Sequence, residues 1–253
     1  RGYKGTYLFA WLGCTTPLDK QVWDVMGQLG SRLFFYTLET AAATTTDELM
    51  QAMEHPGRYK RGLEECQDAV CQVVEALFAS PKRDVAWMNR EVRKEIAHCA
   101  ELLAIMRTPA DGKNETPPQP EAPTRAAAVL GAFARGRALV HDRNTVLHDD
   151  LPFIVHVMLS TMPHDRRTIL LAMAMKDGAP LTVEQVSTAT GISRHTAESC
   201  MAELDWLGLM TFNQAGMGKT ARLSIHEKWA WVMAPQFRKL LMPPPTWQKS
   251  GGV

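Results

Sequence analysis

The chain has 253 residues, enough for two or three small domains, with 45% hydrophobic and 22% charged residues, as in ordinary globular proteins. Its net charge of +1 excludes a global electrostatic attraction to nucleic acid or to a membrane surface. No apolar run approaches the roughly 18 residues that span a bilayer, so we expect no membrane partner. Five cysteines, without CxxC spacing, predict free thiols in a reducing, cytoplasmic setting. The scattered histidines predict no metal site.

Residues 1–40 are predicted to form two apolar strands around a short helix at about 18–28. Both apolar segments are almost continuously hydrophobic, which is typical of strands buried on both faces of a parallel sheet. The first strand ends at Thr16, just before a proline, and the second follows Arg32. The first strand begins within a few residues of an arginine at position 1, so we expect the chain to be cut from a longer protein.

Residues 41–107 are predicted to be helical. Apolar side chains recur at three- and four-residue steps in two stripes, at 63–77 and 85–106. Pro81 separates them, because a proline cannot continue the first helix but can open the second. The pattern predicts two antiparallel helices that pack on each other through these stripes.

Two segments are predicted to lack a fold of their own. Residues 108–124 contain five prolines and almost no large apolar side chain, so they cannot bury enough surface to offset the entropy of ordering. We interpret residues 108–124 as a mobile linker. Residues 232–253 are expected to be a tail, of which 242–253 are rich in proline and glycine.

Residues 125–162 are predicted to form two further helices, at 125–140 and at about 150–160. Apolar residues recur along both segments. Asp149 or Asp150 is expected to cap the second helix by accepting its free backbone N–H groups.

Residues 163–231 show the order helix, helix, turn, helix, hairpin. The expected helices lie at 167–175, 182–190 and 193–207, and the expected strands at 210–212 and 221–225. Thr182 and Gln185 have capping-box spacing at the start of the second helix, and Ser193 caps the third. This order is that of a winged helix-turn-helix.

In a winged helix-turn-helix the third helix enters the major groove and the wing contacts the backbone. The side chains expected to face DNA are Arg194, His195, Thr196, Ser199, Lys219 and Arg222. Seven basic and seven acidic residues lie between Pro163 and Lys228, so this module lacks the basic surface that drives nonspecific affinity. DNA is the expected partner, and a protein-contact role is the alternative.

The sequence Gly-Met-Gly-Lys-Thr at 216–220 superficially matches a phosphate-binding loop. The eight-residue pattern requires glycine where Asn213 stands, with a strand before it and a helix after it. The following ARLSI reads as a strand, so no helix N-terminus is available to bind phosphate. We interpret this segment as the tip of the wing.

The segment GCTTPLDKQVWDVMGQLGSRLFF resembles the sensor-1, helix and Ser-Arg-Phe finger region of MCM-type AAA+ helicases and of their relatives on phages and integrative mobile elements. By position, Thr16 matches sensor 1, commonly Asn in MCM proteins, and Arg32 matches the arginine finger, followed here by Leu33 rather than Phe. Arg125 matches sensor 2 in the lid, with Arg135 and Arg137 behind it. The sequence VLHDDLPFIVHV resembles the segment that closes the lid.

The resemblance implies a mostly α fold with small β elements: a remnant of an AAA+ α/β core, a helical lid with a hairpin insertion, and an appended winged helix. It implies a fragment of a ring-forming, ATP-dependent DNA helicase or translocase. An arginine finger would act on ATP of a neighbouring subunit, an effect worth about 10³ to 10⁵ in rate.

ATP and Mg²⁺ are expected in the full-length protein. The chain alone carries no Walker A loop, so it is expected to bind neither and to be inactive. Two alternatives remain open from the sequence. One is a non-enzymatic winged-helix DNA-binding regulator, and the other is a protein-interaction module that uses the helical hairpin and a neutral winged helix.

Overall fold

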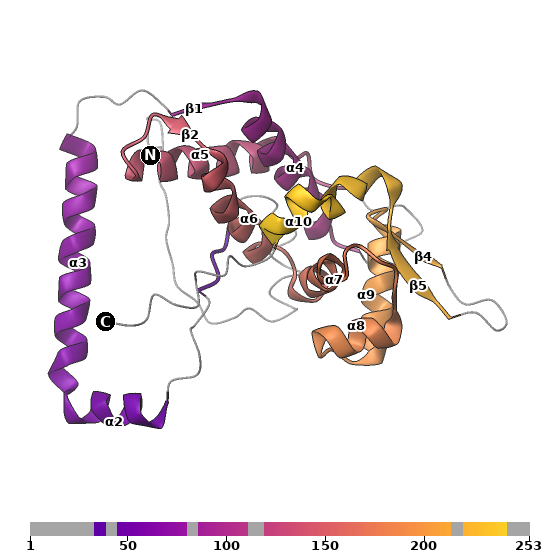
Figure 1. The fold of residues 1–253 in the computed structure, drawn as a ribbon, viewed down its shortest axis with the longest axis horizontal. Coiled ribbons are helices and arrows are strands. Elements are labelled where there is room, and N and C mark those ends of the chain that lie inside the picture. The colour runs from indigo at the N-terminus through magenta and orange to yellow at the C-terminus, as the bar shows by residue number, and fades with distance from the viewer. Residues whose placement is uncertain (1–32, 39–44, 80–85, 111–118, 214–219, 242–253) are drawn as a thin grey trace, which may run out of the picture.

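The computed structural model describes residues 33–38, 45–79, 86–110, 119–213 and 220–241. The described chain is mostly helical with small parallel and antiparallel sheets, as the sequence predicts (Figure 1). The α-helices are α2 (Thr46–Glu54), α3 (Pro56–Ala79), α4 (Arg90–Arg107), α5 (Thr124–Val140), α6 (Leu151–Ser160), α7 (His164–Met175), α8 (Val183–Thr190), α9 (Arg194–Trp206) and α10 (Pro235–Leu241). Two short 3-10 helices are η1 (His148–Asp150) and η2 (Glu227–Met233).

Two small sheets accompany the helices. The strands are β1 (Trp87–Met88), β2 (Thr145–Val146), β3 (Leu181–Thr182), β4 (Met210–Asn213) and β5 (Arg222–Ile225). Strands β1 and β2 pair in parallel, with Met88 opposite Val146. Strand β5 lies between β3 and β4 and is antiparallel to both. In the described residues, no helix is long and apolar enough to cross a membrane.

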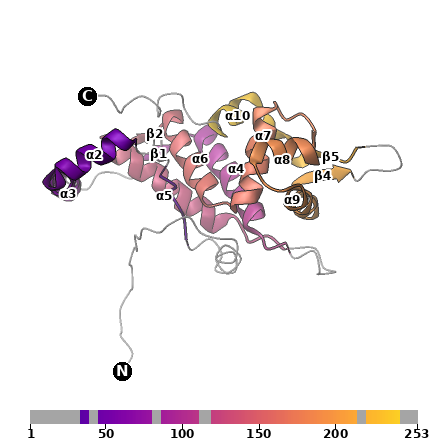
Figure 2. The same cartoon turned by 90° about the horizontal axis from the view of Figure 1, so that it is seen from below.

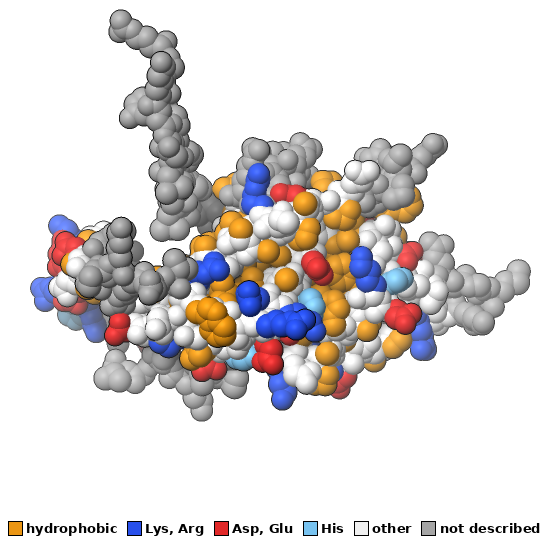
Figure 3. Space-filling view, turned by 90° about the horizontal axis from the view of Figure 1, so that it is seen from above, with side chains coloured by type: hydrophobic (Ala, Val, Ile, Leu, Met, Phe, Trp, Pro, Cys, Tyr) orange, Lys and Arg blue, Asp and Glu red, His pale blue; other side chains and the backbone are white. Residues whose placement is uncertain are grey.

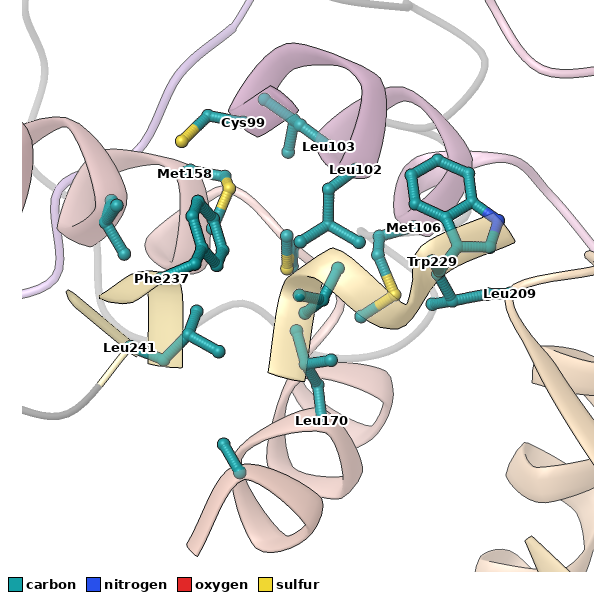
Figure 4. Packing of buried hydrophobic residues seen from close by; sticks show 14 of the residues in the cluster. Cys99, Leu102, Leu103, Met106, Met158, Leu170, Leu209, Trp229, Phe237 and Leu241 are labelled. Carbon is teal, nitrogen blue, oxygen red and sulfur yellow. The ribbon is translucent and has the colours of Figure 1, made fainter. Parts of the chain in front are cut away.

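The hydrophobic core is formed by α4, α5, α6 and α7, and the C-terminal helices close it. Helix α4 packs on both α5 and α6. Figure 4 shows Leu102, Leu103 and Met106 of α4 pointing toward Met158 of α6 and toward side chains of η2 and α10. Apolar burial of this kind contributes about 25 cal/mol per Å² and dominates the stability of such a body.

The C-terminal helix corrects one prediction. The segment 232–253 is expected to be a tail, yet η2 and α10 extend to Leu241 and pack on α6 and α7. Phe237 and Leu241 are 3% and 2% exposed, because they point from one face of α10 into the core (Figure 4). The proline-rich residues 242–253 lie outside the described residues, as do 111–118 of the predicted linker.

The predicted helical hairpin is wrong in two respects. Helix α4 begins only at Arg90, because Asn89 accepts the Val92 N–H at 2.8 Å and caps it, and Met88 lies in β1 instead. Helix α4 packs on α5 and α6 rather than on α3, which stands at one edge of the molecule in both views (Figures 1 and 2). The apolar stripe of α4 is therefore core, whereas that of α3 is exposed to solvent.

Residues 33–38, expected to be a strand, are irregular. Two of their backbone N–H groups donate to side chains at the C-terminal end of α6. The Phe35 N–H donates to Thr161 Oγ1 and the Thr37 N–H donates to Ser160 Oγ, both at 3.0 Å. Arg107 donates to the Leu33 carbonyl at 3.3 Å. The strand expected before Thr16, the helix at 18–28 and Arg32 itself lie outside the described residues.

Asp150 is buried in a cluster of arginines rather than capping α6 with its side chain. Arg143 donates two hydrogen bonds to its carboxylate, at 2.6 and 2.9 Å, and the Leu147 N–H donates a third at 2.9 Å. Arg137 Nε lies 3.2 Å from the same group. Burial by itself would raise the pKa of Asp150, but these hydrogen bonds and charges lower it below its usual range.

We predict that Asp150→Asn destabilises the fold by about 2 kcal/mol at neutral pH, because the donors of Arg143 and the Leu147 N–H lose a charged acceptor. The folded-state pKa of Asp150 lies below the unfolded value, so its contribution is complete above about pH 4 and is lost as the pH falls through the folded pKa. Urea unfolding from pH 7 down to pH 3 measures this. The variant should lose stability less steeply in acid than the native chain, and parallel curves would contradict the prediction.

Candidate nucleic-acid interface

The turn between α8 and α9 is built by local capping, as the sequence predicts. Thr182 and Gln185 form a reciprocal capping box at the start of α8, with hydrogen bonds of 3.2 and 2.9 Å. Gly191 ends α8 at φ 73°, a left-handed conformation that glycine adopts without a steric penalty. Ser193 then accepts the Thr196 N–H at 3.1 Å and starts α9. These contacts fix the direction of α9.

The predicted hairpin is confirmed as β4 and β5. A third strand, β3, completes the sheet and was not predicted from the sequence. Strand β5 pairs with β4 from Met210 opposite Ile225 to Asn213 opposite Arg222. Its other edge pairs with β3, where Leu181 lies opposite Leu223. Two residues are too few for an alternating pattern, so β3 could be recognised only from its pairing. The glycine-rich segment between β4 and β5, which includes Lys219, lies outside the described residues at 214–219.

Helix α9 has one buried side and one open side. The buried side chains are Ala197, Cys200, Met201 and Leu204. The exposed ones include His195, Glu198, Ser199 and Ala202. Their spacing places them on one helix face, since residues three, four and seven apart are neighbours on an α-helix. Helix α9 therefore presents an open face to solvent, which is polar in its N-terminal half and ends at the exposed ring of Trp206.

Of the residues predicted to face DNA, most are exposed but two are already engaged. Arg194 Nη2 lies 2.7 Å from Glu184 Oε1 on α8. Thr196 is partly buried and its hydroxyl lies 2.8 Å from that of Ser193, so it belongs to the N-cap. His195, Ser199 and Arg222 are exposed, with Arg222 on β5.

On the face in view in Figure 3, Lys and Arg side chains lie among Asp and Glu side chains. Within residues 163–228, Arg166 and Glu203 are paired with each other and contribute little charge to an outer face. Arg194 is partly neutralised by Glu184.

Arg166 joins three helices and was not singled out by the sequence. From α7 it donates to Glu203 Oε2 on α9 through Nε and Nη2, at 3.1 and 3.0 Å. Its Nη1 donates to the carbonyls of Met106 and Thr108 at the end of α4, at 2.8 and 2.7 Å. A cation at a helix C-terminus satisfies free carbonyls and complements the helix dipole. The partners lie 37 to 60 residues away in sequence, so no local pattern could reveal them.

Arg125, the predicted sensor 2, is exposed in the first turn of α5. The two arginines behind it are oriented differently. Arg137 lies beside Asp150 and over the Phe153 ring, 5.5 Å from its centroid. Arg135 is partly buried and its Nε finds no hydrogen-bond partner in the described part of the chain. Arg125 is thus the arginine of this helix best placed to reach a ligand.

The two predicted catalytic residues stay predictions. Thr16 and Arg32 lie outside the described residues.

Within the described ranges, no group of three or more His, Cys, Asp or Glu side chains is placed to bind a metal ion. Cys99 is buried, and burial raises the pKa of its thiol, so this cysteine is not a nucleophile.

We predict that Arg166→Met destabilises the protein by about 3 kcal/mol, because Glu203 and two backbone carbonyls lose their donor. Urea unfolding measures the change. The double variant Arg166→Met/Glu203→Leu should recover part of the loss, since it leaves no unpaired charge. Arg90→Ala, at an exposed position on α4, is the control and should leave stability within about 0.5 kcal/mol. Equal stability of the single variant and the control would contradict this role for Arg166.

The open face of α9, the β4–β5 hairpin and the exposed Arg125 are the features from which function can be argued. Comparison of the chain with protein-family models, with curated proteins and with solved structures finds no match.

Proposed function

We propose that residues 164–225 form a winged helix-turn-helix that binds double-stranded DNA. The support is the order of elements: α7, β3, α8, α9 and then the β4–β5 hairpin, with β5 between β3 and β4. A helix that follows such a turn commonly lies in the major groove. The observation that carries the proposal is the open face of α9, whose opposite side packs in the core.

The dimensions and chemistry of α9 suit the major groove. Its 13 residues span about 20 Å, and the groove is about 12 Å wide, enough for one helix. His195 and Ser199 carry hydrogen-bond donors and acceptors that can meet base edges. Arg194 and Arg222 are the described cations nearest in sequence to this face and hairpin, and we assign them to phosphates.

The balanced charge of this module sets the expected character of the binding. Each phosphate contact adds a slope of about −0.9 to the dependence of log K on log salt. With two arginines assigned to phosphates, and one of them also paired with Glu184, the module should bind with modest affinity and a shallow salt dependence. Contacts from α9 to base edges then matter more than they do for a strongly basic module.

We predict that Ser199→Glu weakens binding to a duplex by at least about tenfold, because a carboxylate on the groove face is repelled by the phosphates. Ser199 is exposed and glutamate favours helix, so the fold should be unaffected. Fluorescence anisotropy with duplex DNA at two salt concentrations is the measurement. In the same assay, Arg222→Ala should reduce the salt slope by about one.

Two matched variants make this test specific. Ser199→Gln changes the size of the side chain without adding charge and should retain binding to within about threefold. Ala132→Glu adds the same charge at an exposed position on α5, away from α9, and should bind like the native chain. If the native chain fails to bind duplex DNA even at low salt, the DNA proposal fails and a protein-contact role is favoured.

We further propose that this module serves a ring-forming, ATP-dependent AAA+ helicase or translocase, of which the chain is one part. The resemblance around Thr16, Arg32 and Arg125 is the basis. One structural observation favours it: the segment after Arg32 packs against the helix that begins near Arg125. The ring of Phe34 meets that of Phe133 on α5 at 6.0 Å between centroids. Residues 33–38, which follow Arg32 in sequence, and α5 then pack together.

This ATPase proposal assigns roles by position in the sequence. Arg32 would stabilise charge on the ATP of a neighbouring subunit, and Thr16 would orient the attacking water. Arg125 would contact the γ-phosphate, and its exposure at the start of α5 leaves it free to reach a ligand outside this body. ATP and Mg²⁺ would be bound by the phosphate-binding loop of the full-length protein, which this chain does not include.

In the full-length protein we predict that Arg32→Ala reduces ATP hydrolysis by about 10³-fold or more while ATP binding changes little, because the finger acts on the transition state. Steady-state phosphate release and binding of a fluorescent ATP analogue measure the two effects. Arg90→Ala serves as the matched control and should hydrolyse ATP normally. Normal turnover in Arg32→Ala would contradict the finger role. An upstream sequence without a Walker A loop would favour the non-enzymatic regulator.

A further inference from the structure

An ion pair joins the first turns of α8 and α9, the two helices of the helix-turn-helix. Arg194 Nη2, at the start of α9, lies 2.7 Å from Glu184 Oε1, in the first turn of α8. Their side chains are 71% and 52% exposed. Two charges that water surrounds to this extent attract each other weakly, so the contact adds little to stability and can be exchanged for another partner.

The pair lies on the part of the module that the proposed binding mode brings to DNA. When a helix-turn-helix binds a duplex, N-terminal residues of its second helix approach the base edges and its first helix crosses the phosphate backbone. Arg194 begins the second helix, and Glu184 lies at the start of the first. The same approach therefore carries a cation and a carboxylate toward the backbone.

The two charges have opposite effects on binding. An arginine that reaches a phosphate displaces counterions and strengthens binding to any sequence. A carboxylate at the same place repels phosphate, and the net charge of the pair is zero while it holds Arg194.

The fold does not require a carboxylate at position 184. The start of α8 is capped by Thr182 and Gln185, whose reciprocal hydrogen bonds do not involve the Glu184 side chain. The side chain of Glu184 is exposed, so no packing in the core depends on it. Removing its charge should leave α8 and the turn in place, and the effect on Arg194 can be measured by itself.

We propose that Glu184 restrains DNA binding: it holds Arg194 in the free protein, and Arg194 exchanges this carboxylate for a backbone phosphate when a duplex binds. This role rests on the proposed DNA-binding function. Its consequence is specificity. Phosphate contacts support binding to every sequence, whereas contacts from α9 to base edges do not, so a restrained Arg194 lowers the sequence-independent part of the affinity.

Binding of the whole chain to a fluorescent duplex of random sequence, followed by anisotropy, tests the exchange. Glu184→Gln removes the charge and keeps nearly the same side-chain size. It should lower the dissociation constant about three- to fivefold, the upper range for the loss of an exposed ion pair. Since Arg194 then contacts phosphate without a competing carboxylate, log K should fall more steeply with log salt, by up to about one in slope.

A double-mutant cycle shows whether Glu184 acts through Arg194. In an Arg194→Ala background, Glu184→Gln should change the affinity by less than about 1.5-fold, because the restrained cation is gone. Glu91→Gln is the matched control. Glu91 also lies in the first turn of a helix, 3.7 Å from His148, and at the opposite end of α4 from the Arg166 contact. This variant should bind like the native chain, because its charge is too distant to act on the duplex.

The outcomes separate this role from DNA binding itself. If the native chain binds and Glu184→Gln binds equally or more weakly, the restraint is overturned while the DNA-binding function stands. Equal tightening with and without Arg194 would also overturn it, since Glu184 would then act by repelling phosphate alone. If neither the native chain nor Glu184→Gln binds duplex at low salt, the DNA-binding proposal fails and the restraint with it. Circular dichroism should show the same helix content for all variants.

Discussion

The guanidinium of Arg166 is the constraint on which the arrangement of this molecule depends. It is 7% exposed and donates to the end of α4 and to α9 at once. A buried guanidinium must have its donors satisfied, because an unpaired charge in the interior costs several kcal/mol. The two carbonyls of α4 and the carboxylate of Glu203 satisfy it only when α4, α7 and α9 meet at one point. The helical core and the helix proposed to bind DNA are thereby fixed to each other.

This connection affects the chemistry of the proposed interface. Glu203 faces inward and accepts hydrogen bonds from Arg166. The face of α9 opposite the core carries His195 and Ser199 beside Glu198. With cations and anions in balance, long-range attraction to DNA is weak. The proposed recognition then relies on the fit of α9 in the groove.

Several predictions failed where the sequence pattern gave an apolar face but not its partner. The stripes of α3 and α4 have similar periodicity, yet one is exposed and the other is core, because α5, α6 and η2 supply the surfaces that cover α4. The segment 33–38 is apolar enough for a strand, but its backbone is irregular, and the N–H groups of Phe35 and Thr37 donate to Thr161 and Ser160. Helix α10 was missed because its covering residues lie on α6 and α7.

What the sequence determined by itself was local. The caps at Thr182 and Ser193, the turn at Gly191 and the β4–β5 hairpin follow from interactions between neighbours or across one short loop, so residue type and spacing suffice. Tertiary structure alone decided the parallel pairing of β1 with β2, the burial of Asp150 among arginines, and the engagement of Arg166 with Glu203. The physical reason is that a charge or an apolar stripe has no preferred partner in sequence. Its partner is set by which helices the core brings together.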